Sequence, residues 1–470
     1  MSDAIVVGSG PNGLACAALL ARAGVQVTVL EAEPTIGGGT RTTELTLPGL
    51  LHDHCSAIHP MAVGSAAFAE LDLAAHGLAW CWPEVDLAHP LDDGSAAVMV
   101  RSIEETAAGL GADGRTWKRL FGRPSAGFAE LNEDLVQPVL HVPRHALRLA
   151  RFGLPAAAPA TLTARSFRGP HARALFGGVA AHSLSPLTRP LSSAIGMALI
   201  AAGHHNGWPV ARGGSRAITD ALAAIVLQHG GTIETGRRVT TLSELPAADA
   251  VVLDLAPAGV VELAGERLPG HVQRAYRRYR HGPGAFKVDL AVEGGIPWAS
   301  PACRKAGTLH LAGSFEEMVV AEREINQGRM PARPVVLVSQ QYLADPTRSA
   351  GDVHPVWSYA HVPAGYDGDA TEALIGQIER FAPGVRERIV ATSVRRPTAF
   401  QDYNANYIGG DIVTGANTPK QMIVRPRVSL SPYATGIPGV FICSAATPPG
   451  AGVHGMNGFN AAQAVLRELR

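Results

Sequence analysis

The stretch AIVVGSGPNGLACAALLARAGVQVTVLE, residues 4–31, decides the fold. A β-branched run, AIVV, precedes a glycine-rich turn, and small and apolar residues then follow at helical spacing as far as Gly24. VQVTVLE forms a second β-branched run. This order predicts strand, helix and parallel strand, the βαβ unit of a Rossmann-type dinucleotide-binding domain in an α/β fold.

The turn carries Gly8, Gly10 and Gly13 in the spacing G-x-G-x-x-G. Glycines at this spacing permit a tight turn and a close approach of the backbone to a pyrophosphate at the helix N-terminus. Glu31 follows about 20 residues later, where a carboxylate binds the ribose hydroxyls. A carboxylate there repels a 2′-phosphate, so FAD or NAD is expected rather than NADP. The predicted cofactor contacts also include the neighbouring residues Pro11, Asn12 and Ala32.

The same glycine spacing recurs at 109–114 and at 450–455. A polar, helix-forming stretch precedes the first recurrence, which therefore predicts a helix end and a solvated turn. The second follows a strand-like run, GVFICSA, and precedes a helix-like run, NGFNAAQAVLREL. Only fifteen residues follow Gly455, so we do not expect a second Rossmann unit there. A helix N-terminus facing an anionic or electron-rich group is expected instead.

The bulk composition limits the classes of function. A chain of 470 residues predicts at least two domains, and 40 basic against 40 acidic residues predict no nucleic-acid partner. Five scattered cysteines without metal-ligand spacing predict no metal site and no structural disulfide, which is typical of a reduced, cytoplasmic protein. The N-terminus leaves no room for a cleavable leader, and no apolar run reaches the ~18 residues of a membrane span.

A glycine cluster with a basic residue follows the βαβ unit, in EAEPTIGGGTRTTEL. Gly38, Gly39 and Thr40 lead into Arg41, which could give a charge-assisted contact to a diphosphate held at the first glycine turn. The alternative is a surface turn with a solvated arginine.

On these residues the sequence resembles the flavin-dependent family that contains phytoene (carotenoid) desaturases, retinol saturases and amine oxidases. GSGPNGLACAALLARAGVQVTVLEAEPTIGGG is similar to the family's N-terminal FAD signature, and ATPPGAGVHG, residues 446–455, to the C-terminal signature of its carotenoid branch. The segment GWPVARGGSRAITDALAAIVLQHGGTIETGRRV also looks like the central segment that the family shares. The likeness is greatest to phytoene-dehydrogenase-like proteins of the pyridine nucleotide-disulfide oxidoreductase-domain type.

The resemblance implies FAD as the cofactor, with the chain's last helix directed at the pyrimidine end of the flavin. Gly455, Met456 and Asn457 would offer backbone N–H groups to the flavin O2 and N1 atoms, and Val239 would contact the adenine through its backbone. Where amine oxidases usually carry an acidic residue, Ser444 and Ala445 stand here. This departure favours the carotenoid-type branch.

The resemblance, together with the order of strand-like and helix-like stretches along the chain, predicts a glutathione-reductase-like FAD domain with an inserted α+β substrate domain. The FAD domain is expected to be discontinuous, over residues 1–72, 205–284 and 396–470. Residues 73–204 are expected to form a helical cap, and 285–395 an antiparallel sheet with a covering helix. In the cap, LRLARFGL contains Arg148 and Arg151 and predicts a helix over the substrate cavity. A basic helix that contacts a membrane surface is the open alternative.

Candidate acid and base residues are less clearly marked. His454 lies in the C-terminal signature and is the first candidate for a catalytic proton relay, with a hydrogen-bonded packing residue as the alternative. Further candidates lie in HDHCSAIHP and FQDYNANYIGGD, namely His52, Asp53, His54, Cys55, His59, Asp402, Asn404, Asn406 and Asp411.

The predicted function is that of an FAD-dependent oxidoreductase that dehydrogenates or isomerises a small hydrophobic substrate by hydride transfer to flavin N5. Two alternatives stay open: a flavin amine oxidase, and a flavin-binding interaction protein with little catalysis. The sequence leaves the substrate, the electron acceptor and the choice between monomer and homodimer undecided.

Overall fold

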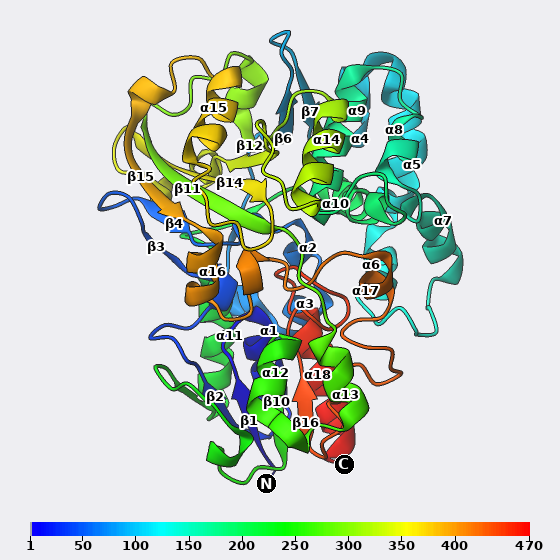
Figure 1. Cartoon of the computed structure of the whole chain (residues 1–470), viewed down its shortest axis with the longest axis vertical. Coiled ribbons are helices and arrows are strands. Elements are labelled where there is room, and N and C mark those ends of the chain that lie inside the picture. The colour runs from blue at the N-terminus through cyan, green and yellow to red at the C-terminus, as the bar shows by residue number, and fades with distance from the viewer. Residues whose placement is uncertain (1) are drawn as a thin grey trace.

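Two β-sheets organise the chain in a computed structural model that describes residues 2–470. Figure 1 shows the smaller sheet at the lower end, beside both termini, and the larger sheet at the upper end. Helices from the first half of the chain lie alongside the larger sheet.

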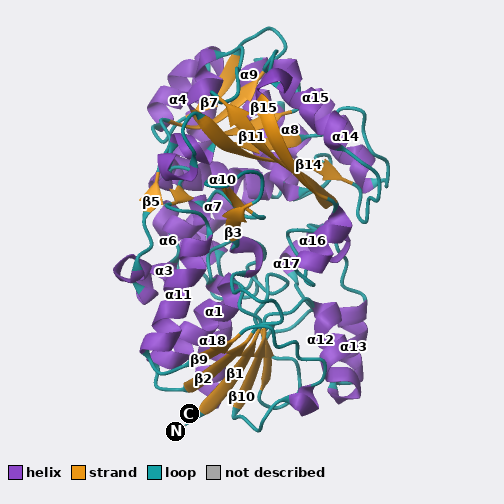
Figure 2. Ribbon diagram, turned by 90° about the vertical axis from the view of Figure 1, so that its left-hand side faces the viewer, coloured by secondary structure: helices purple, strands orange, loops and turns teal. Residues whose placement is uncertain are grey.

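The smaller sheet has five parallel strands in the order β16-β10-β1-β2-β9. Their bounds are β1 (Asp3–Val7), β2 (Gln26–Leu30), β9 (Thr232–Glu234), β10 (Ala250–Leu253) and β16 (Val440–Ile442). Segments from the start, middle and end of the chain therefore meet in one sheet, which Figure 2 shows at the foot of the molecule. With α1 (Pro11–Arg22) between β1 and β2, the predicted βαβ unit is confirmed.

Helices cover both faces of this sheet because its strands are apolar on both sides. Ala4 and Val6 of β1 pack with α1, and Ile5 and Val7 belong to the core of the opposite face. The first face is covered by α1, α11 (Arg216–Gln228) and α18 (Met456–Glu468). The second is covered by α12 (Pro257–Ala264) and α13 (Gly270–Arg277). Since α1 packs between α11 and α18, the last helix of the chain lies beside the first.

The larger sheet has seven strands in the order β15-β11-β14-β13-β12-β6-β7. Their bounds are β6 (Val85–Pro90), β7 (Ala96–Met99), β11 (Gly284–Glu293), β12 (Ala306–Leu311), β13 (Val336–Ser339), β14 (Val353–Val362) and β15 (Ile389–Arg395). The sheet is mixed, because β6 and β12 pair in parallel while all other neighbouring strands of the sheet pair antiparallel. The strands expected from residues 285–395 pair with one another only in antiparallel fashion, as predicted, and the parallel partner β6 comes from outside that segment.

The alternation of side chains gives this sheet two different faces. Phe286, Val288 and Leu290 of β11 belong to an apolar core that includes residues of α15 (Thr371–Phe381). The alternate positions Lys287 and Asp289 belong to the other face, which is also buried. The register extends this face across the sheet, because Tyr359 of β14 pairs with Lys287 and with Leu337 of β13, and Leu337 pairs with His310 of β12.

The helices beside this sheet come mainly from residues 103–206. They are α4 (Ile103–Gly109), α5 (Gly114–Ala126), α6 (Phe128–Leu135), α7 (Ala146–Ala156), α8 (Ala160–Ala164), α9 (Pro170–Ala180) and α10 (Ser192–Asn206). The expected helical segment 73–204 also supplies β6 and β7 to the large sheet, so a description as helices alone was incomplete. α4 ends at Gly109, which confirms that the second glycine motif marks a helix end.

One helix of the substrate region was not anticipated. α14 (Phe315–Asn326) packs against α9 and begins with a capping box, in which Ser314 and Glu317 each bond to the other's backbone N–H. The S-x-x-E pattern at residues 314–317 is the sequence signal of such a helix start.

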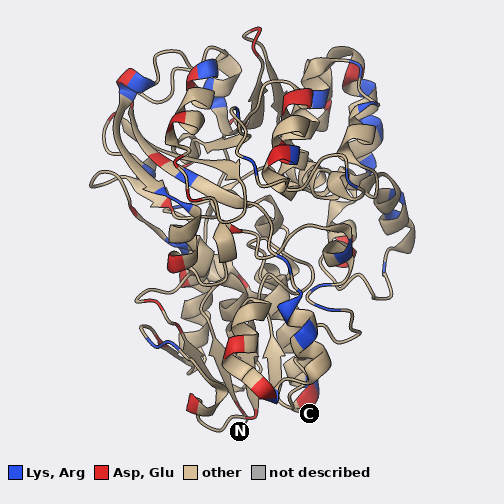
Figure 3. Cartoon of the chain, viewed as in Figure 1, with Lys and Arg blue, Asp and Glu red and all other residues tan. Residues whose placement is uncertain are grey.

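Short elements connect the two halves of the molecule. They are β3 (Thr42–Glu44), β4 (Leu51–Asp53), α2 (Pro60–Val63), α3 (Ala66–Leu71), β5 (Trp80–Cys81), β8 (Val210–Ala211), α16 (Pro397–Tyr403) and α17 (Pro419–Ile423). Within residues 2–470, no helix is long and apolar enough to cross a bilayer. Figure 3 shows acidic and basic residues interspersed over the upper and lower halves of the molecule, in keeping with its net charge of zero.

Candidate cofactor and substrate site

The glycine turn after β1 brings two backbone segments into very close contact. A Cβ on Gly13 would lie 2.2 Å from the carbonyl oxygen of Gly8, and Gly8 itself has a φ of +103°. Neither position accepts an L side chain without displacement of the backbone. The first turn of α1 is thus pressed against the end of β1, with its amides at the carboxyl edge of the sheet.

Glu31 comes directly after β2, at the same edge of the sheet. Its Oε2 accepts the backbone N–H of Ser9 at 2.9 Å, and its Oε1 accepts the N–H of Glu33 at 2.9 Å. These bonds fix the buried carboxylate beside the glycine turn. Its position is the one in which a carboxylate accepts ribose hydroxyls.

The second glycine cluster lies against the first. A Cβ on Gly38, whose φ is +50°, would lie 3.0 Å from the Cα of Gly10. The guanidinium of Arg41 is buried, donates to the carbonyl of Thr35 and lies 3.6 Å from Glu31. Arg41 is therefore held in place and is not a solvated surface residue.

A cavity of about 500 Å³ begins at these glycines and continues toward the large sheet. This volume is within the usual range of ligand sites. The predicted cofactor contacts that line it are Gly8, Gly10, Pro11, Asn12, Glu31, Ala32, Gly38, Gly39, Arg41, Val239 and Ala445. Residues from three distant parts of the sequence thus meet at one cavity.

Two of the predicted contacts, Gly13 and Thr40, do not line the cavity. Gly13 and Thr40 support the two glycine turns, since the Thr40 hydroxyl donates to the carbonyl of Gly37 at 2.7 Å. Val239 lines the cavity from the loop that follows β9, which ends at Glu234.

The C-terminal signature contributes the loop before α18 rather than the first turn of that helix. Pro449, Gly450, Ala451, Gly452 and Val453 line the cavity. Ser444, Gly455, Met456 and Asn457 are not among the residues that line it. The contacts predicted for these four residues with a flavin stay predictions.

Asn457 positions that loop through its side chain. Its Nδ2 donates to the carbonyl oxygens of Thr447 at 2.8 Å and of Pro448 at 3.2 Å. Gly458 lies so close to α1 that a Cβ there would be 1.9 Å from the carbonyl oxygen of Asn12. The contact between the first and last helices therefore fixes where the C-terminal loop meets the glycine turn.

His454 lies at the start of α18, and its ring is buried. Its Nδ1 accepts the backbone N–H of Met456 at 3.1 Å, and burial lowers the pKa of its ring to about 4. It does not line the cavity, and its ring instead bonds to the backbone at the first residue of α18. Its assignment as a catalytic residue stays a prediction without a contact to support it.

The other polar candidates divide between the cavity and the scaffold. His59 lines the cavity with Cys55, and its Nε2 is 2.9 Å from the Ser215 hydroxyl. Asp53 is buried in an ion pair with Arg348 at 2.6 Å. The remaining candidates are placed as follows: Asn404 and Asn406 line the cavity, whereas His52, His54, Asp402 and Asp411 do not.

Several cavity residues were not predicted from the sequence. Trp357 and Tyr359 line it from β14, Leu337 from β13, and Trp208 and His182 from the helical side. No local motif marks them, since they reach the cavity only because the large sheet faces the nucleotide domain. Tyr403 and Tyr407 add two more aromatic side chains to the cavity wall.

His182 is paired with another histidine. Its Nε2 lies 2.9 Å from the Nε2 of His310, and burial lowers the pKa of His182 to about 3 and that of His310 well below its usual value. Both rings are therefore neutral at physiological pH, with one proton in the bond between them.

The groups of at least three His, Cys, Asp or Glu side chains that could hold a metal ion are absent from residues 2–470.

Asp254 is a further unpredicted residue of the site. Its Oδ2 accepts the N–H of Gly13 at 3.0 Å, at the N-terminus of α1 where a diphosphate would be bound. Burial is the main reason that its pKa is raised to about 7, and the charge of Glu31 raises it further. The protonated form of Asp254 is thus readily accessible and removes a negative charge from the diphosphate position.

The residues present fit a dinucleotide. The glycine positions form a cradle that any Cβ would fill, Glu31 is placed for a ribose, and Arg41 adds a cation beside the helix N-terminus. The cavity extends beyond this cradle to an apolar and aromatic region beside the large sheet. Such a site has room for a substrate next to the cofactor.

The comparisons with known proteins agree with this architecture. The family profile described as NAD(P)-binding Rossmann-like domain matches residues 6–71. The whole chain is 24% identical to pyridine nucleotide-disulfide oxidoreductase domain-containing protein 2 of Rattus norvegicus, of which it covers 94%.

Two solved structures have the same fold over nearly their full lengths. An oxidoreductase from Methanosarcina mazei matches 99% of this chain and 100% of its own, with a TM-score of 0.63 and 15% identity. Cyclohexylamine oxidase from Brevibacterium oxydans IH-35A matches 100% of this chain and 99% of its own, with a TM-score of 0.58 and 15% identity. The predicted α/β fold with a Rossmann-type dinucleotide-binding domain is confirmed.

Proposed function

We propose that this protein is an FAD-dependent oxidoreductase that dehydrogenates or isomerises a hydrophobic substrate. The single observation that carries the proposal is the cavity itself, which joins a dinucleotide cradle to an apolar region walled by Trp208, Trp357 and Tyr359. FAD, when bound, supplies a hydride acceptor at its N5 atom. The names of the relatives, which are oxidoreductases, support the same class of enzyme.

The protein's own residues would bind, orient and shield the reactants. The amides at the start of α1, with Arg41, would hold the diphosphate, and Glu31 would hold the ribose. The loop 449–453, which precedes α18, forms one wall of the cavity. Leu199 and Leu337 contribute apolar surface that excludes water from the substrate region.

The similarity to carotenoid desaturases is a finer proposal and depends on the two terminal signatures. The apolar end of the cavity supports a hydrophobic substrate without defining its chemical structure. Two histidines, His59 and His182, line the cavity, and burial lowers the pKa of both, so each would be a neutral hydrogen-bonding group at pH 7.

Oxidation of an amine is the second candidate. It is favoured by the aromatic wall of Tyr403, Tyr407 and Trp357 and by the fold shared with cyclohexylamine oxidase. The buried cation Arg425 in the same cavity opposes an ammonium substrate. We therefore rank the amine second.

The proposal is tested by the colour and flavin content of the purified protein. The expected preparation is yellow, and Glu31→Ala or Gly10→Val should lower its flavin content strongly. A protein that takes up no FAD on reconstitution would contradict the proposal. An anaerobic screen of hydrophobic substrates and of amines for bleaching of the flavin absorbance then decides between the two reactions.

A further inference from the structure

The cavity contains a buried positive charge that has no carboxylate partner. Four cationic side chains are buried within residues 2–470, and three of them are ion-paired. The pairs are Arg41 with Glu31, Lys287 with Asp289, and Arg348 with Asp53. The fourth, Arg425, has no described carboxylate oxygen within 4.0 Å. A buried cation is costly unless an anion or strong acceptors compensate for its lost hydration.

Neutral groups hold Arg425 in a fixed orientation. The residue is 4% exposed, its Nε donates to the carbonyl of Gln421 at 2.9 Å, and its Nη2 donates to Oδ1 of Asn417 at 3.0 Å. Nη1 makes no hydrogen bond within the described chain and lies against Gly450. Two of the five N–H donors are therefore used, and the others remain for a ligand.

Arg425 lines the cavity beside the C-terminal loop and close to the helical wall. Arg425, Asn417 and Gly450 all line it, so the guanidinium lies beside the C-terminal loop. Asn417 Nδ2 donates to the carbonyl of Ser183 at 3.0 Å, next to His182 on the helical wall. Arg425 therefore lies between the C-terminal loop and the helical side.

A residue eleven positions before Arg425 has an unusual backbone conformation. Thr414 lines the cavity with a φ of +54°, a left-handed conformation that is uncommon for a β-branched residue. Its carbonyl accepts the Tyr279 hydroxyl at 3.0 Å. Backbone strain of this kind is concentrated at ligand sites.

The cavity that Arg425 lines also has apolar surface. Leu199, Leu337, Ile412 and Met422 line the same cavity. A ligand that fits both features has an apolar body and one anionic group. We propose that Arg425 binds the carboxylate of a lipophilic carboxylic acid, which is the substrate of the oxidoreductase proposed above and on which this inference rests.

Calorimetry with two isosteric probes tests this assignment. Octanoate and octanamide are titrated at pH 8 into the purified protein, whose flavin content is measured in the same sample. The wild-type protein should bind octanoate about 10-fold or more tightly than octanamide, as a charge-assisted hydrogen bond predicts. Arg425→Gln should abolish this preference, and Arg425→Lys should keep part of it.

Two further variants separate loss of the charge from loss of the fold. Asn417→Asp places a carboxylate on the guanidinium and should abolish the preference although the arginine is retained. Arg427→Gln removes a cation two residues away that does not line the cavity, and it should behave as the wild type. Thermal unfolding verifies that each variant is folded.

The outcomes are distinct for the two proposals. Equal affinity of the wild type for both probes, or an unchanged preference in Arg425→Gln, would overturn the assignment. If Arg425→Gln instead loses flavin and keeps the preference, the anion bound by Arg425 belongs to the cofactor and the assignment is wrong. A colourless protein that prefers octanoate would support the carboxylate site while contradicting the FAD proposal.

Discussion

The carboxylate of Asp254 accepts the backbone N–H of Gly13 at 3.0 Å, across 241 positions of the chain. Asp254 follows β10, and Gly13 lies in the first turn of α1, so the bond joins two segments of the nucleotide-binding sheet at its carboxyl edge. It also places an acidic group where a diphosphate would be bound. The charge state of Asp254 should therefore influence both stability and cofactor binding.

Asp254→Asn should change how stability depends on pH. Because burial raises the pKa of Asp254 from 3.8 to about 7, the folded protein binds more protons than the unfolded chain between these values. Stability from this residue is then fully present below pH ~4 and is lost as the pH rises through about 7. The variant should be more stable than the wild type above pH 7, by at most ~4 kcal/mol.

Thermal unfolding of both proteins without flavin, from pH 4.5 to 8, measures this difference. The melting temperatures should be closest at the acidic end and separate as the pH rises. Parallel curves over the whole range would show that Asp254 does not titrate in this window.

Gly13→Ala should lose the cofactor. The new Cβ would lie 2.2 Å from the carbonyl oxygen of Gly8, so the turn that approaches the diphosphate must open. We expect flavin content to fall at least 10-fold, which corresponds to about 1.4 kcal/mol or more of binding free energy.

Gly376→Ala is the matched control for this substitution. A Cβ on Gly376, in α15, would meet no atom within 4 Å. Since alanine is the better helix former, stability should be unchanged or rise by up to ~1 kcal/mol, with full flavin content. Retention of flavin by Gly13→Ala would place the diphosphate elsewhere.

Arg348→Met should destabilise the protein without touching the cavity lining. Arg348 is fully buried and pairs with Asp53 at 2.6 Å and with Asp345 at 3.3 Å. Removing one partner of a buried ion pair leaves an uncompensated charge and costs ~3–5 kcal/mol. Chemical denaturation measures the change.

The double variant Arg348→Met with Asp53→Asn should recover part of that loss. The asparagine no longer leaves a buried negative charge, and its side chain can still accept the N–H of Ser215, which Asp53 accepts at 2.7 Å. A double variant as unstable as the sum of both single variants would argue that the pair is not coupled.

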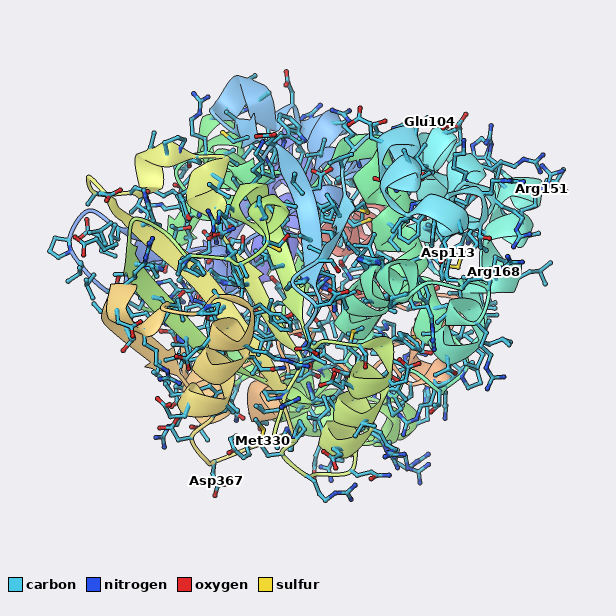
Figure 4. The ribbon with its side chains drawn as sticks, turned by 90° about the horizontal axis from the view of Figure 1, so that it is seen from above. Glu104, Asp113, Arg151, Arg168, Met330 and Asp367 are labelled. Atoms are coloured by element: carbon cyan, nitrogen blue, oxygen red, sulfur yellow. The ribbon has the colours of Figure 1, made fainter. Side chains whose placement is uncertain are left out.

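Contact with a membrane surface is the open alternative for the α7 region, and an experiment can test it. Leu154 is 80% exposed, and Val142, just before α7, is 92% exposed. Arg151 of α7 points outward at the edge of the helical region, as Arg168 does (Figure 4). We expect the protein to sediment with vesicles that contain anionic lipid, and Leu154→Glu to reduce binding several-fold.

Neutral vesicles and high salt are the controls for this experiment. Binding should fall in both, because basic side chains such as Arg148 and Arg151 contribute to it. A protein that remains in the supernatant with anionic vesicles at low salt would assign α7 to the outer surface of the substrate region alone.

The nucleotide-binding half was predictable because its signals are local. The run 4–31 contains the strand, turn, helix and acidic residue in one stretch, and β1, α1 and β2 lie where it predicts them. β16 and α18 were also marked by their own patterns, GVFICSA and NGFNAAQAVLREL. In each case the residues that decide the structure are neighbours in sequence.

The substrate half was predicted less completely. β6 and β7 were missed because short strands between helices lack a periodic pattern long enough to distinguish them. α14 carried a recognisable capping box at Ser314 and Glu317 that was not used. The parallel pairing of β6 with β12 joins segments more than 200 positions apart, and no local pattern encodes such a register.

The sequence by itself determined that a dinucleotide cradle exists, because the steric demands of Gly8, Gly10 and Gly13 and the charge of Glu31 act over a few residues. Only the tertiary structure decided what faces that cradle. Asp254 and Arg425 become functional candidates because the fold buries both side chains. The fold also places the Gly13 N–H against Asp254 and places no carboxylate against Arg425. Neither property can be read from an isolated Asp or Arg in the sequence. Long-range packing sets the charge that each residue presents to the cavity.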